Sequence, residues 1–296
     1  MVGVIGLGGM GSGIASTLAR GGFDIVVYDI DPARIAPVVA TAGADSAIAA
    51  TDIADVCARA DTVVLSLPSS RVTVDVIENQ IAPVSKRGTT VIDMGTTIVR
   101  ETRRLHALLS SRGVSLVDAP VSGGTAGAAK GELFVFVGGD KPAVDAGWSV
   151  LKAVGGARVT HCGPSGAGQV TKAVNQLAMG LVDAAFIEAV AFGVNGGVDA
   201  ETLKEAVGGD SGWREHLART AGRIAAGEGD ANDVKYAEFA YFLDFVRDQR
   251  FPSPMLDALY AYMSRFPETA RDNMNRPYPP LWSALTNRPT PEGGAS

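Results

Sequence analysis

Several residue types that define common protein classes are scarce in this chain of 296 residues. It contains only two cysteines, Cys57 and Cys162, and they lie far apart in the sequence. This excludes a small fold held by several disulfides, and we expect a reducing, cytoplasmic location. The three histidines, His106, His161 and His216, lack the spacing of metal ligands, so we expect no metal site.

Charge is also limited, since charged residues make up 20% of the sequence and the formal net charge is −6. No cluster of lysine and arginine forms the basic face that neutralises nucleic-acid phosphates, so we expect no nucleic-acid partner. The most apolar window, Leu177 to Val194, is interrupted by Asp183 and Glu188. Because charges are costly inside a membrane, we interpret this window as a helix of a soluble protein and expect no membrane association.

The sequence that is present divides into two parts with different periodicity. Short apolar runs alternate with helical stretches up to His161, which predicts βαβ units and a parallel sheet with further strands extending it. After His161 the strand-like runs cease and helical periodicity continues to about Phe266. We therefore predict an α/β domain over residues 1–162 and an all-α domain over residues 163–296.

One long stretch joins the two predicted domains. A glycine-rich loop begins at Gly163, and a mostly apolar helix without internal proline follows over residues 166–195. Lys172 and Asn175 are three residues apart and therefore project from the same side of this helix. Gln176 falls near that side as well, which makes it a candidate substrate neighbour. We expect Lys172 to act in a cleft between the two domains.

A glycine motif, Gly6-Leu7-Gly8-Gly9-Met10-Gly11, follows the first strand-like run and opens a helix. In such a motif the first glycine permits a tight turn, the second lets the backbone approach a pyrophosphate, and the third lets the helix pack on the sheet. The next strand ends in Asp29, whose carboxylate can bind ribose hydroxyls of NAD and repel the 2′-phosphate of NADP. Arg34 lies near enough to complicate this preference. The motif predicts a dinucleotide site that favours NAD over NADP.

Three motifs occur in an order and spacing that resemble the β-hydroxyacid dehydrogenases. They are the glycine motif, Asp118-Ala119-Pro120-Val121-Ser122-Gly123-Gly124, and Gly163-x-x-Gly166-x-Gly168-x-x-x-Lys172-x-x-Asn175-Gln176. That family includes 3-hydroxyisobutyrate dehydrogenase and tartronate semialdehyde reductase, and is related to 6-phosphogluconate dehydrogenase. The resemblance implies a Rossmann-type domain with an extended mixed sheet, followed by an all-α domain joined by the long helix. It also implies a homodimer or homotetramer, with the helical domain at the subunit interface.

The resemblance further implies a role for each matching residue. The dinucleotide is bound by Gly6, Leu7, Gly8, Gly9, Met10 and Gly11; the nicotinamide is flanked by Leu67, Pro68 and Thr96; the substrate carboxylate is held by Ser122, Gly123 and Gly124; and the catalytic residues are Lys172 and Asn175. The chemistry of these residues agrees. Successive backbone N–H groups can cradle an oxyanion, and a lysine with a pKa lowered by a partly dry cleft can accept the alcohol proton. We therefore expect NAD-dependent interconversion of a 3-hydroxyacid and its semialdehyde or ketoacid.

The largest departure from the family pattern lies at the start of a late helix. Members carry Lys-Asp-Leu at the start of a late helix, whereas this chain has Ala237-Glu238-Phe239, with Lys235 nearby as a candidate substitute. The segment is rich in aromatic residues, which indicates either core packing or a larger, less polar substrate pocket with Trp213 at its wall. Two alternatives stay open. An imine reductase is disfavoured because those enzymes generally replace the residue at Lys172, and a non-catalytic dinucleotide-binding protein is favoured only by the missing lysine.

Overall fold

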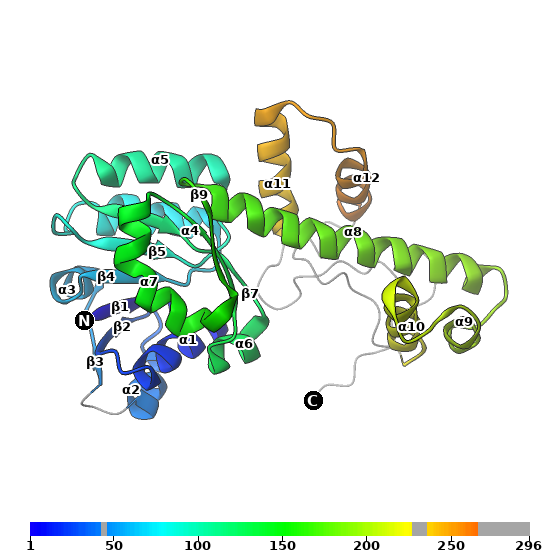
Figure 1. Cartoon of the computed structure of the whole chain (residues 1–296), viewed down its shortest axis with the longest axis horizontal. Coiled ribbons are helices and arrows are strands. Elements are labelled where there is room, and N and C mark those ends of the chain that lie inside the picture. Colours follow the sequence, from blue (N-terminus) through cyan, green and yellow to red (C-terminus); the bar gives the residue numbers. More distant parts are fainter. Residues whose placement is uncertain (43–45, 227–235, 266–296) are drawn as a thin grey trace. The chain divides into compact units, whose positions relative to one another are not determined.

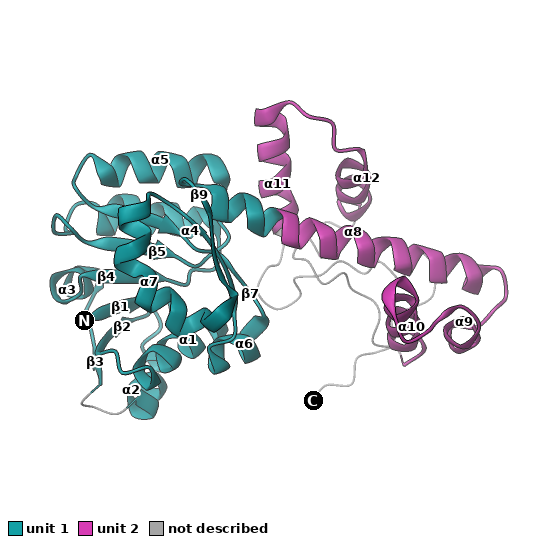
Figure 2. Ribbon diagram, in the orientation of Figure 1, with its two compact units in different colours: residues 1–173 teal, residues 174–296 magenta. Residues whose placement is uncertain are grey.

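The computed structural model describes residues 1–42, 46–226 and 236–265 (Figure 1). The chain folds into two compact units, one from Met1 to Ala173 and the other from Val174 to Ser296 (Figure 2). The division falls within helix α8 (Ala167–Asn195) and not at the glycine loop that precedes it, where the sequence pattern changes. The first turns of α8 therefore belong to the α/β unit.

The first unit is built on a nine-stranded sheet with the order β3-β2-β1-β4-β5-β6-β8-β7, and β9 pairs with β8. Its first six strands are parallel and follow the Rossmann order, whereas β8 runs antiparallel to β6 and β7. The predicted Rossmann-type domain with an extended mixed sheet is thus confirmed. The strands are β1 (Val2–Ile5), β2 (Ile25–Tyr28), β3 (Ala47–Ala49), β4 (Thr62–Leu65), β5 (Thr90–Asp93), β6 (Ser115–Asp118), β7 (Val121–Ser122), β8 (Phe134–Gly138) and β9 (Val159–Gly163).

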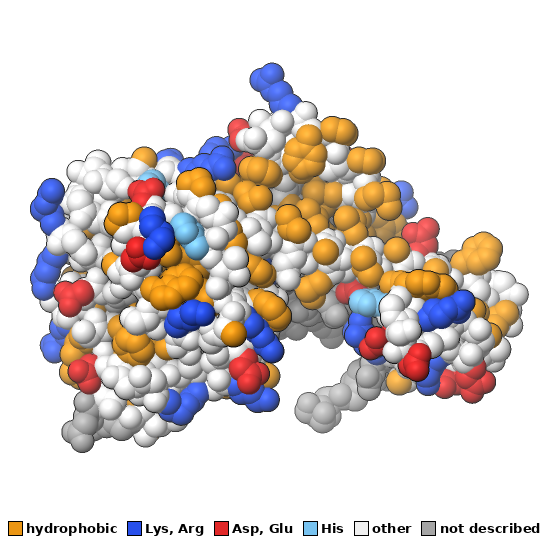
Figure 3. Space-filling model, in the orientation of Figure 1, with side chains coloured by type: hydrophobic (Ala, Val, Ile, Leu, Met, Phe, Trp, Pro, Cys, Tyr) orange, Lys and Arg blue, Asp and Glu red, His pale blue; other side chains and the backbone are white. Residues whose placement is uncertain are grey.

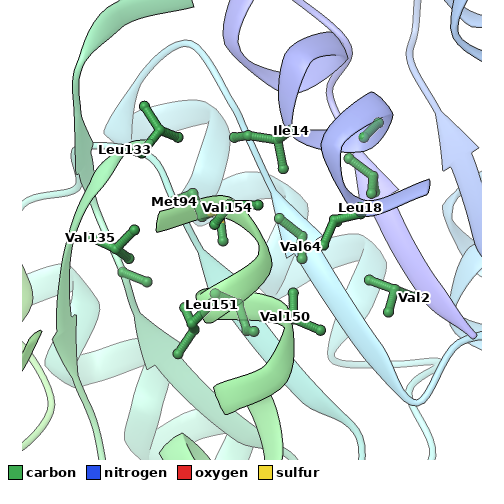
Figure 4. Packing of buried hydrophobic residues seen from close by; sticks show 14 of the residues in the cluster. Val2, Ile14, Leu18, Val64, Met94, Leu133, Val135, Val150, Leu151 and Val154 are labelled. Atoms are coloured by element: carbon green, nitrogen blue, oxygen red, sulfur yellow. The ribbon is translucent and has the colours of Figure 1, made fainter. Parts of the chain in front are cut away.

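Helices cover both faces of this sheet, which explains why its parallel strands are nearly continuous apolar runs. One face packs against α1 and α7, where Ile14 and Leu18 meet Val64 of the sheet and Val150 and Leu151 of α7 (Figure 4). The other face packs against α3, the π-helix η2 and α5. The helical segments are α1 (Gly9–Arg20), η1 (Pro32–Arg34), α2 (Ile35–Ala42), α3 (Ile53–Arg59), α4 (Ser70–Asp75), η2 (Val76–Ile81), α5 (Val99–Ser110), α6 (Gly124–Lys130), α7 (Lys141–Gly155) and η3 (Gly156–Arg158).

The described part of the second unit is helical, as the sequence predicts. The remainder of α8 is followed by α9 (Ala200–Val207), α10 (Gly212–Ala225), α11 (Tyr236–Gln249) and α12 (Pro254–Met263). Local chemistry sets some of these boundaries. Asp199 caps α9 by accepting a hydrogen bond from the Thr202 N–H at 2.9 Å, and Pro254 occupies the first turn of α12, where no N–H partner is needed.

Helix α8 carries much apolar surface. By length and composition alone it could cross a membrane, a test that core helices of soluble proteins also pass, and only 28% of its most apolar window is buried within the chain. Phe192 is 83% exposed and Val174 is 62% exposed, while Met179 and Val182 are each 40% exposed. Figure 3 shows apolar side chains gathered over the helical unit. An exposed apolar surface of this kind is typical of a site that contacts another protein.

Candidate active site

The glycine motif forms the turn between β1 and α1. Gly6 has φ of 89°, and a Cβ there would lie 2.4 Å from the Ser66 carbonyl oxygen. At Gly11 a Cβ would lie 1.9 Å from the Gly6 carbonyl oxygen, so neither position accepts a side chain. Gly8 differs, because the nearest described atom to its Cβ would be Arg34 Nη1 at 3.8 Å. Open space thus faces the backbone where a pyrophosphate would approach.

The start of α1 has the character of an anion site. Gly8 is its N-cap, and among the described residues no side chain caps the helix there. The first N–H groups of α1 and the positive end of its dipole therefore remain available to phosphate oxygens. The residues present fit a bound dinucleotide at this turn.

Asp29, one residue beyond β2, connects this turn to the second strand. Its carboxylate is buried, and its Oδ2 accepts a hydrogen bond from the Leu7 N–H at 2.6 Å while Oδ1 accepts one from the Asp31 N–H at 2.9 Å. Arg34 Nη1 lies 3.8 Å from Asp29 Oδ2, and Arg34 Nε lies 3.3 Å from Asp31 Oδ2. A carboxylate and a guanidinium therefore stand together where the adenosine ribose would bind.

The two loops predicted to flank the nicotinamide lie side by side. A Cβ on Gly95 would be 3.4 Å from the Leu67 carbonyl oxygen, which brings the loop after β5 against the loop after β4. Leu67 and Thr96 are half-buried, and Pro68 is exposed. The carboxyl ends of parallel strands meet at one sheet edge, which is where ligands of such sheets bind.

The Asp93 carboxylate holds the loop after β5 in place by hydrogen bonds. It is the last residue of β5 and is buried, and its Oδ1 accepts from the Gly95 N–H at 2.9 Å while Oδ2 accepts from the Thr97 hydroxyl at 2.7 Å. Burial raises the pKa of Asp93 to about 7; the two hydrogen bonds oppose this rise, and the nearby Asp118 adds to it. Asp93 thus titrates near neutral pH.

Asp118, the last residue of β6, holds the start of α8. Its Oδ1 accepts from the Gly166 N–H at 2.8 Å and its Oδ2 accepts from the Gln169 N–H at 3.1 Å. A Cβ at Gly138 would lie 2.6 Å from Asp118 Oδ2, and one at Gly168 would lie 2.8 Å from the same oxygen. The glycines ahead of Lys172 are therefore needed for α8 to approach this carboxylate. Burial raises the pKa of Asp118, against the lowering effect of the backbone N–H groups.

Gln169 was not singled out by the sequence pattern, although it lies three residues before Lys172 on the same helix. Its side chain is buried at 2% exposure. Its Nε2 donates to the Gly95 carbonyl at 2.9 Å, and its Oε1 accepts from the Thr97 N–H at 3.0 Å. Hydrogen bonds between residues more than 70 positions apart in sequence leave no periodic pattern by which they could have been found.

Lys172 follows on the next turn of α8 and is buried, with 6% of its surface exposed. Asn175 is half-buried, and its Nδ2 donates to Gln176 Oε1 at 3.0 Å. Gln176 in turn donates from Nε2 to Glu238 Oε2 of α11 at 2.8 Å, and both of these side chains are buried. The predicted substrate neighbour Gln176 is thus oriented by Asn175 and by Glu238, a buried acid to which the sequence reading gave no role.

The Ser122-Gly123-Gly124 run joins β7 to α6. Gly123 has φ of 129° and Gly124 has φ of 64°, a backbone region that L residues rarely adopt. No described atom lies within 4 Å of a Cβ placed on Gly124. Exposed, consecutive backbone groups in this conformation fit the predicted cradle for a carboxylate.

Trp213 lies in a pocket made wholly by the second unit. The cavity measures about 380 Å³, and Trp213 is 55% exposed at its edge. His216 also lines this pocket; it stacks on Phe186 with ring centroids 5.2 Å apart and places Nε2 3.4 Å from Asp183 Oδ1. Asp183 comes eleven residues after Lys172, or about 16 Å along α8. The lining residues of this pocket thus all belong to the second unit, and a role for Trp213 in the substrate site stays a prediction.

Aromatic residues of α11 are part of the core in the described region. Phe239 is fully buried and Phe242 is 5% exposed, with ring centroids 6.2 Å apart. Lys235, the candidate substitute for the missing family lysine, lies outside the described residues. Among the described residues, no group of histidine, cysteine and acidic side chains could hold a metal ion.

Family models account for most of the chain. Residues 1–163 match the NAD binding domain of 6-phosphogluconate dehydrogenase, and residues 166–270 match the NAD-binding domain of NADP-dependent 3-hydroxyisobutyrate dehydrogenase. The chain belongs to the β-hydroxyacid dehydrogenase family. Its place among the 3-hydroxyisobutyrate dehydrogenase-like members agrees with the three motifs and with the geometry of the glycine turn.

Curated relatives of this family member are dehydrogenases of hydroxyacids. It is 32% identical over 260 residues to 2-(hydroxymethyl)glutarate dehydrogenase of Eubacterium barkeri, covering 86% of this chain and 85% of that protein. It is 37% identical over 214 residues to the NAD-dependent L-serine dehydrogenase of Pseudomonas aeruginosa, covering 70% and 69%. These relationships support an oxidoreductase that uses a nicotinamide dinucleotide.

Solved structures show the same fold. The 3-hydroxyisobutyrate dehydrogenase of Mycobacterium tuberculosis, solved with L-serine, covers 97% of this chain and 98% of its own, with a TM-score of 0.79 and 24% identity. An imine reductase from a Pseudomonas species has a TM-score of 0.59 and 21% identity, covering 97% and 98%. The β-hydroxyacid dehydrogenase and imine reductase structures thus share one architecture, and their different chemistries must come from the site residues.

Proposed function

We propose that this family member interconverts a 3-hydroxyacid and its semialdehyde or ketoacid, with Lys172 as the general acid/base. The observation that carries this proposal is the burial of Lys172 on α8, one turn after Gln169 attaches that helix to the loop after β5. Lysine is one of the side chains that can serve as general acid or base when it is held within reach of the reacting group. The bound nicotinamide would supply the acceptor for the hydride.

Each remaining motif has a task in this proposal. Lys172 accepts the proton of the substrate hydroxyl as the carbon loses hydride, and returns a proton to the carbonyl oxygen in the reverse direction. Asn175 holds the same oxygen through a neutral amide. Backbone N–H groups of Ser122, Gly123 and Gly124 bind the carboxylate, which orients the substrate and fixes which carbon is oxidised.

We propose NAD as the preferred cofactor over NADP. Support comes from the buried carboxylate of Asp29 at the end of β2, where it would accept from ribose hydroxyls and repel a 2′-phosphate. Arg34 acts in the opposite direction, since its guanidinium lies 3.8 Å from the same carboxylate and could pair with that phosphate. The preference therefore reflects the balance between these two side chains.

We also propose that the protein is a homodimer or homotetramer associated through its helical unit. Exposed apolar side chains on α8, Phe192 and Val174 foremost, support a protein interface because large apolar patches are unusual on monomers. Facing such patches toward a second copy removes them from water.

The decisive experiment measures NAD reduction with a panel of 3-hydroxyacids. Wild-type protein should oxidise at least one of them, and Lys172→Ala should lose roughly 100-fold or more in kcat. Lys204→Ala is the matched control, because Lys204 is an exposed helix lysine paired with Glu201, and it should leave kcat unchanged. Turnover that survives Lys172→Ala would remove Lys172 from the mechanism. Tight NAD binding without turnover of any hydroxyacid would favour a non-catalytic role.

A further inference from the structure

The side chain of Gln169 connects the loop after β5 to the first turn of α8. Its amide donates to the Gly95 carbonyl at 2.9 Å and accepts from the Thr97 N–H at 3.0 Å. These two bonds have opposite sense, so only one orientation of the amide satisfies both. We call this pair of hydrogen bonds the Gln169 link.

Both partners of the Gln169 link are fastened to the sheet by a buried carboxylate. Asp93 accepts from the Gly95 N–H and the Thr97 hydroxyl, and Asp118 accepts from the Gln169 N–H. Asp93 and Asp118 are register partners at the ends of neighbouring parallel strands. The link therefore closes a ring of hydrogen bonds that runs from β5 through the loop and α8 to β6.

We propose that Gln169 is a positioning residue, which sets the place of Lys172 relative to the loop that flanks the nicotinamide. This inference rests on the proposed function. Lys172 comes three residues after Gln169 and projects from the same side of the helix. Catalytic geometry tolerates displacements of only about 0.5 Å, and a shift of about 1 Å can cost roughly 100-fold in rate. A rotation or slide of the first turn of α8 would move the Lys172 amine by such amounts.

A purely structural role for Gln169 leads to different expectations. In that case its loss would destabilise the fold, because buried backbone groups of Gly95 and Thr97 would lose their partners, but the folded molecules would react at the normal rate. A positioning role lowers the rate of hydride transfer in molecules that remain folded and still bind NAD. The two readings therefore separate in kcat, in cofactor affinity and in the isotope effect.

The test compares Gln169→Met, which keeps the length of the side chain without its hydrogen bonds, with Thr171→Ala. Thr171 is the matched control because, within the described part of the chain, its hydroxyl bonds inside α8, donating to the Ala167 carbonyl at 2.8 Å. For Gln169→Met we expect kcat to fall roughly 10- to 100-fold, with the Kd for NAD within about three-fold of wild type. A deuterated substrate should show a larger isotope effect on kcat, and backbone amides of residues 94–99 should exchange faster. Thr171→Ala should resemble wild type in all four measurements.

The inference is overturned if kcat of Gln169→Met stays within about two-fold of wild type, or if Thr171→Ala loses as much. Should Gln169→Met fail to fold, Gln169→Glu is judged by the same criteria, since it keeps an acceptor for the Thr97 N–H. A wild-type protein that oxidises no hydroxyacid would contradict the proposed function. In that event, unchanged amide exchange over residues 94–99 in the variant would overturn the link itself, and faster exchange would uphold it.

Discussion

Asp93 and Asp118 are partners in the parallel register of β5 and β6, and each is the last residue of its strand. Both carboxylates are buried, and each is hydrogen-bonded to a different segment of the candidate site. Asp93 holds the loop that contains Thr96, while Asp118 holds the start of the helix that contains Lys172. Two neighbouring acids thus organise the site without touching substrate in the proposed mechanism.

Burial of the Asp93 carboxyl predicts a stability that depends on pH. Its pKa is about 7 in the folded protein and near the ordinary value of 3.8 when unfolded, so the native state binds more protons between these values. Stability should therefore fall as pH rises from about 4 to about 7, by up to roughly 4 kcal/mol, and then level off. Asp118 acts in the same direction. Urea unfolding at several pH values measures the effect.

Asp93→Asn should flatten that pH dependence, and Asp199→Asn provides a contrast. The exposed Asp199 carboxylate caps α9, and hydrogen bonds from Thr202 lower its pKa. Its contribution is present above the ordinary pKa and is lost as the solution becomes more acidic, which is the opposite sign. A wild-type stability that rises between pH 4 and pH 7 would contradict the assignment for Asp93.

Gly168→Ala should damage both stability and activity. An added Cβ would lie 2.3 Å from the Phe136 carbonyl oxygen and 2.7 Å from the Asp118 carbonyl oxygen, so α8 would have to move away from the sheet. We expect the free energy of unfolding to fall by roughly 1–3 kcal/mol, and kcat to fall markedly. Gly222→Ala, inside helix α10, is the control. Its Cβ would lie 3.5 Å from Lys204 Cδ of α9, which is an ordinary van der Waals distance. It should stabilise by roughly 0.5–1 kcal/mol, as measured by urea unfolding.

Arg34→Ala should increase the preference for NAD over NADP. Removing the guanidinium leaves the Asp29 carboxylate to face the 2′-phosphate without a compensating positive charge. We expect the ratio of kcat/KM for NAD over NADP to rise roughly ten-fold, equivalent to about 1.4 kcal/mol. Arg59→Ala, which removes an exposed ion pair with Asp55, is the control and should not change the ratio. An unchanged ratio in Arg34→Ala would show that Arg34 takes no part in cofactor choice.

Phe192→Ser should weaken self-association. The Phe192 side chain is 83% exposed on α8, and placing it against a second copy would remove its surface from water. We expect the dissociation constant of the oligomer to rise at least roughly ten-fold in sedimentation experiments. Val84→Ser is the control, because Val84 is an apolar residue of the α/β unit that is 44% exposed. It should leave the dissociation constant of the oligomer unchanged. A monomeric wild-type protein would contradict the proposed assembly.

Local sequence patterns were sufficient to predict the layout of the fold. Apolar runs such as Ile25–Tyr28 are buried on both faces, so their character reports the parallel sheet directly. Short elements gave no comparable pattern. Strand β3 has three residues, two of them exposed, and α6 is a run of glycine, alanine, threonine and lysine. These elements are set by tertiary packing, as where α6 lies against Gly9 and Gly13 of α1.

The candidate site was predictable only where residue type and chemistry coincide. Gly6, Gly11 and Gly168 stand where a Cβ would collide with backbone, and the spacing of glycines records that constraint. Gln169 and Glu238 were missed, because their importance comes from hydrogen-bond partners distant in sequence. Gln176, which was predicted for its position on the helix face, is bonded to one of these missed residues.

The double attachment of Asp29 limits how coenzyme usage can be re-engineered. Its two oxygens accept hydrogen bonds from the N–H groups of Leu7 and Asp31. Replacing Asp29 would therefore remove the bonds that hold the turn where the pyrophosphate would bind. Adaptation toward NADP is therefore better sought at Ile30, which is 90% exposed, and around Arg34, where side chains can change without loosening the scaffold. In natural variants of this turn, we therefore expect changes of coenzyme preference to come from substitutions at positions 30 and 34 more often than from substitutions of Asp29.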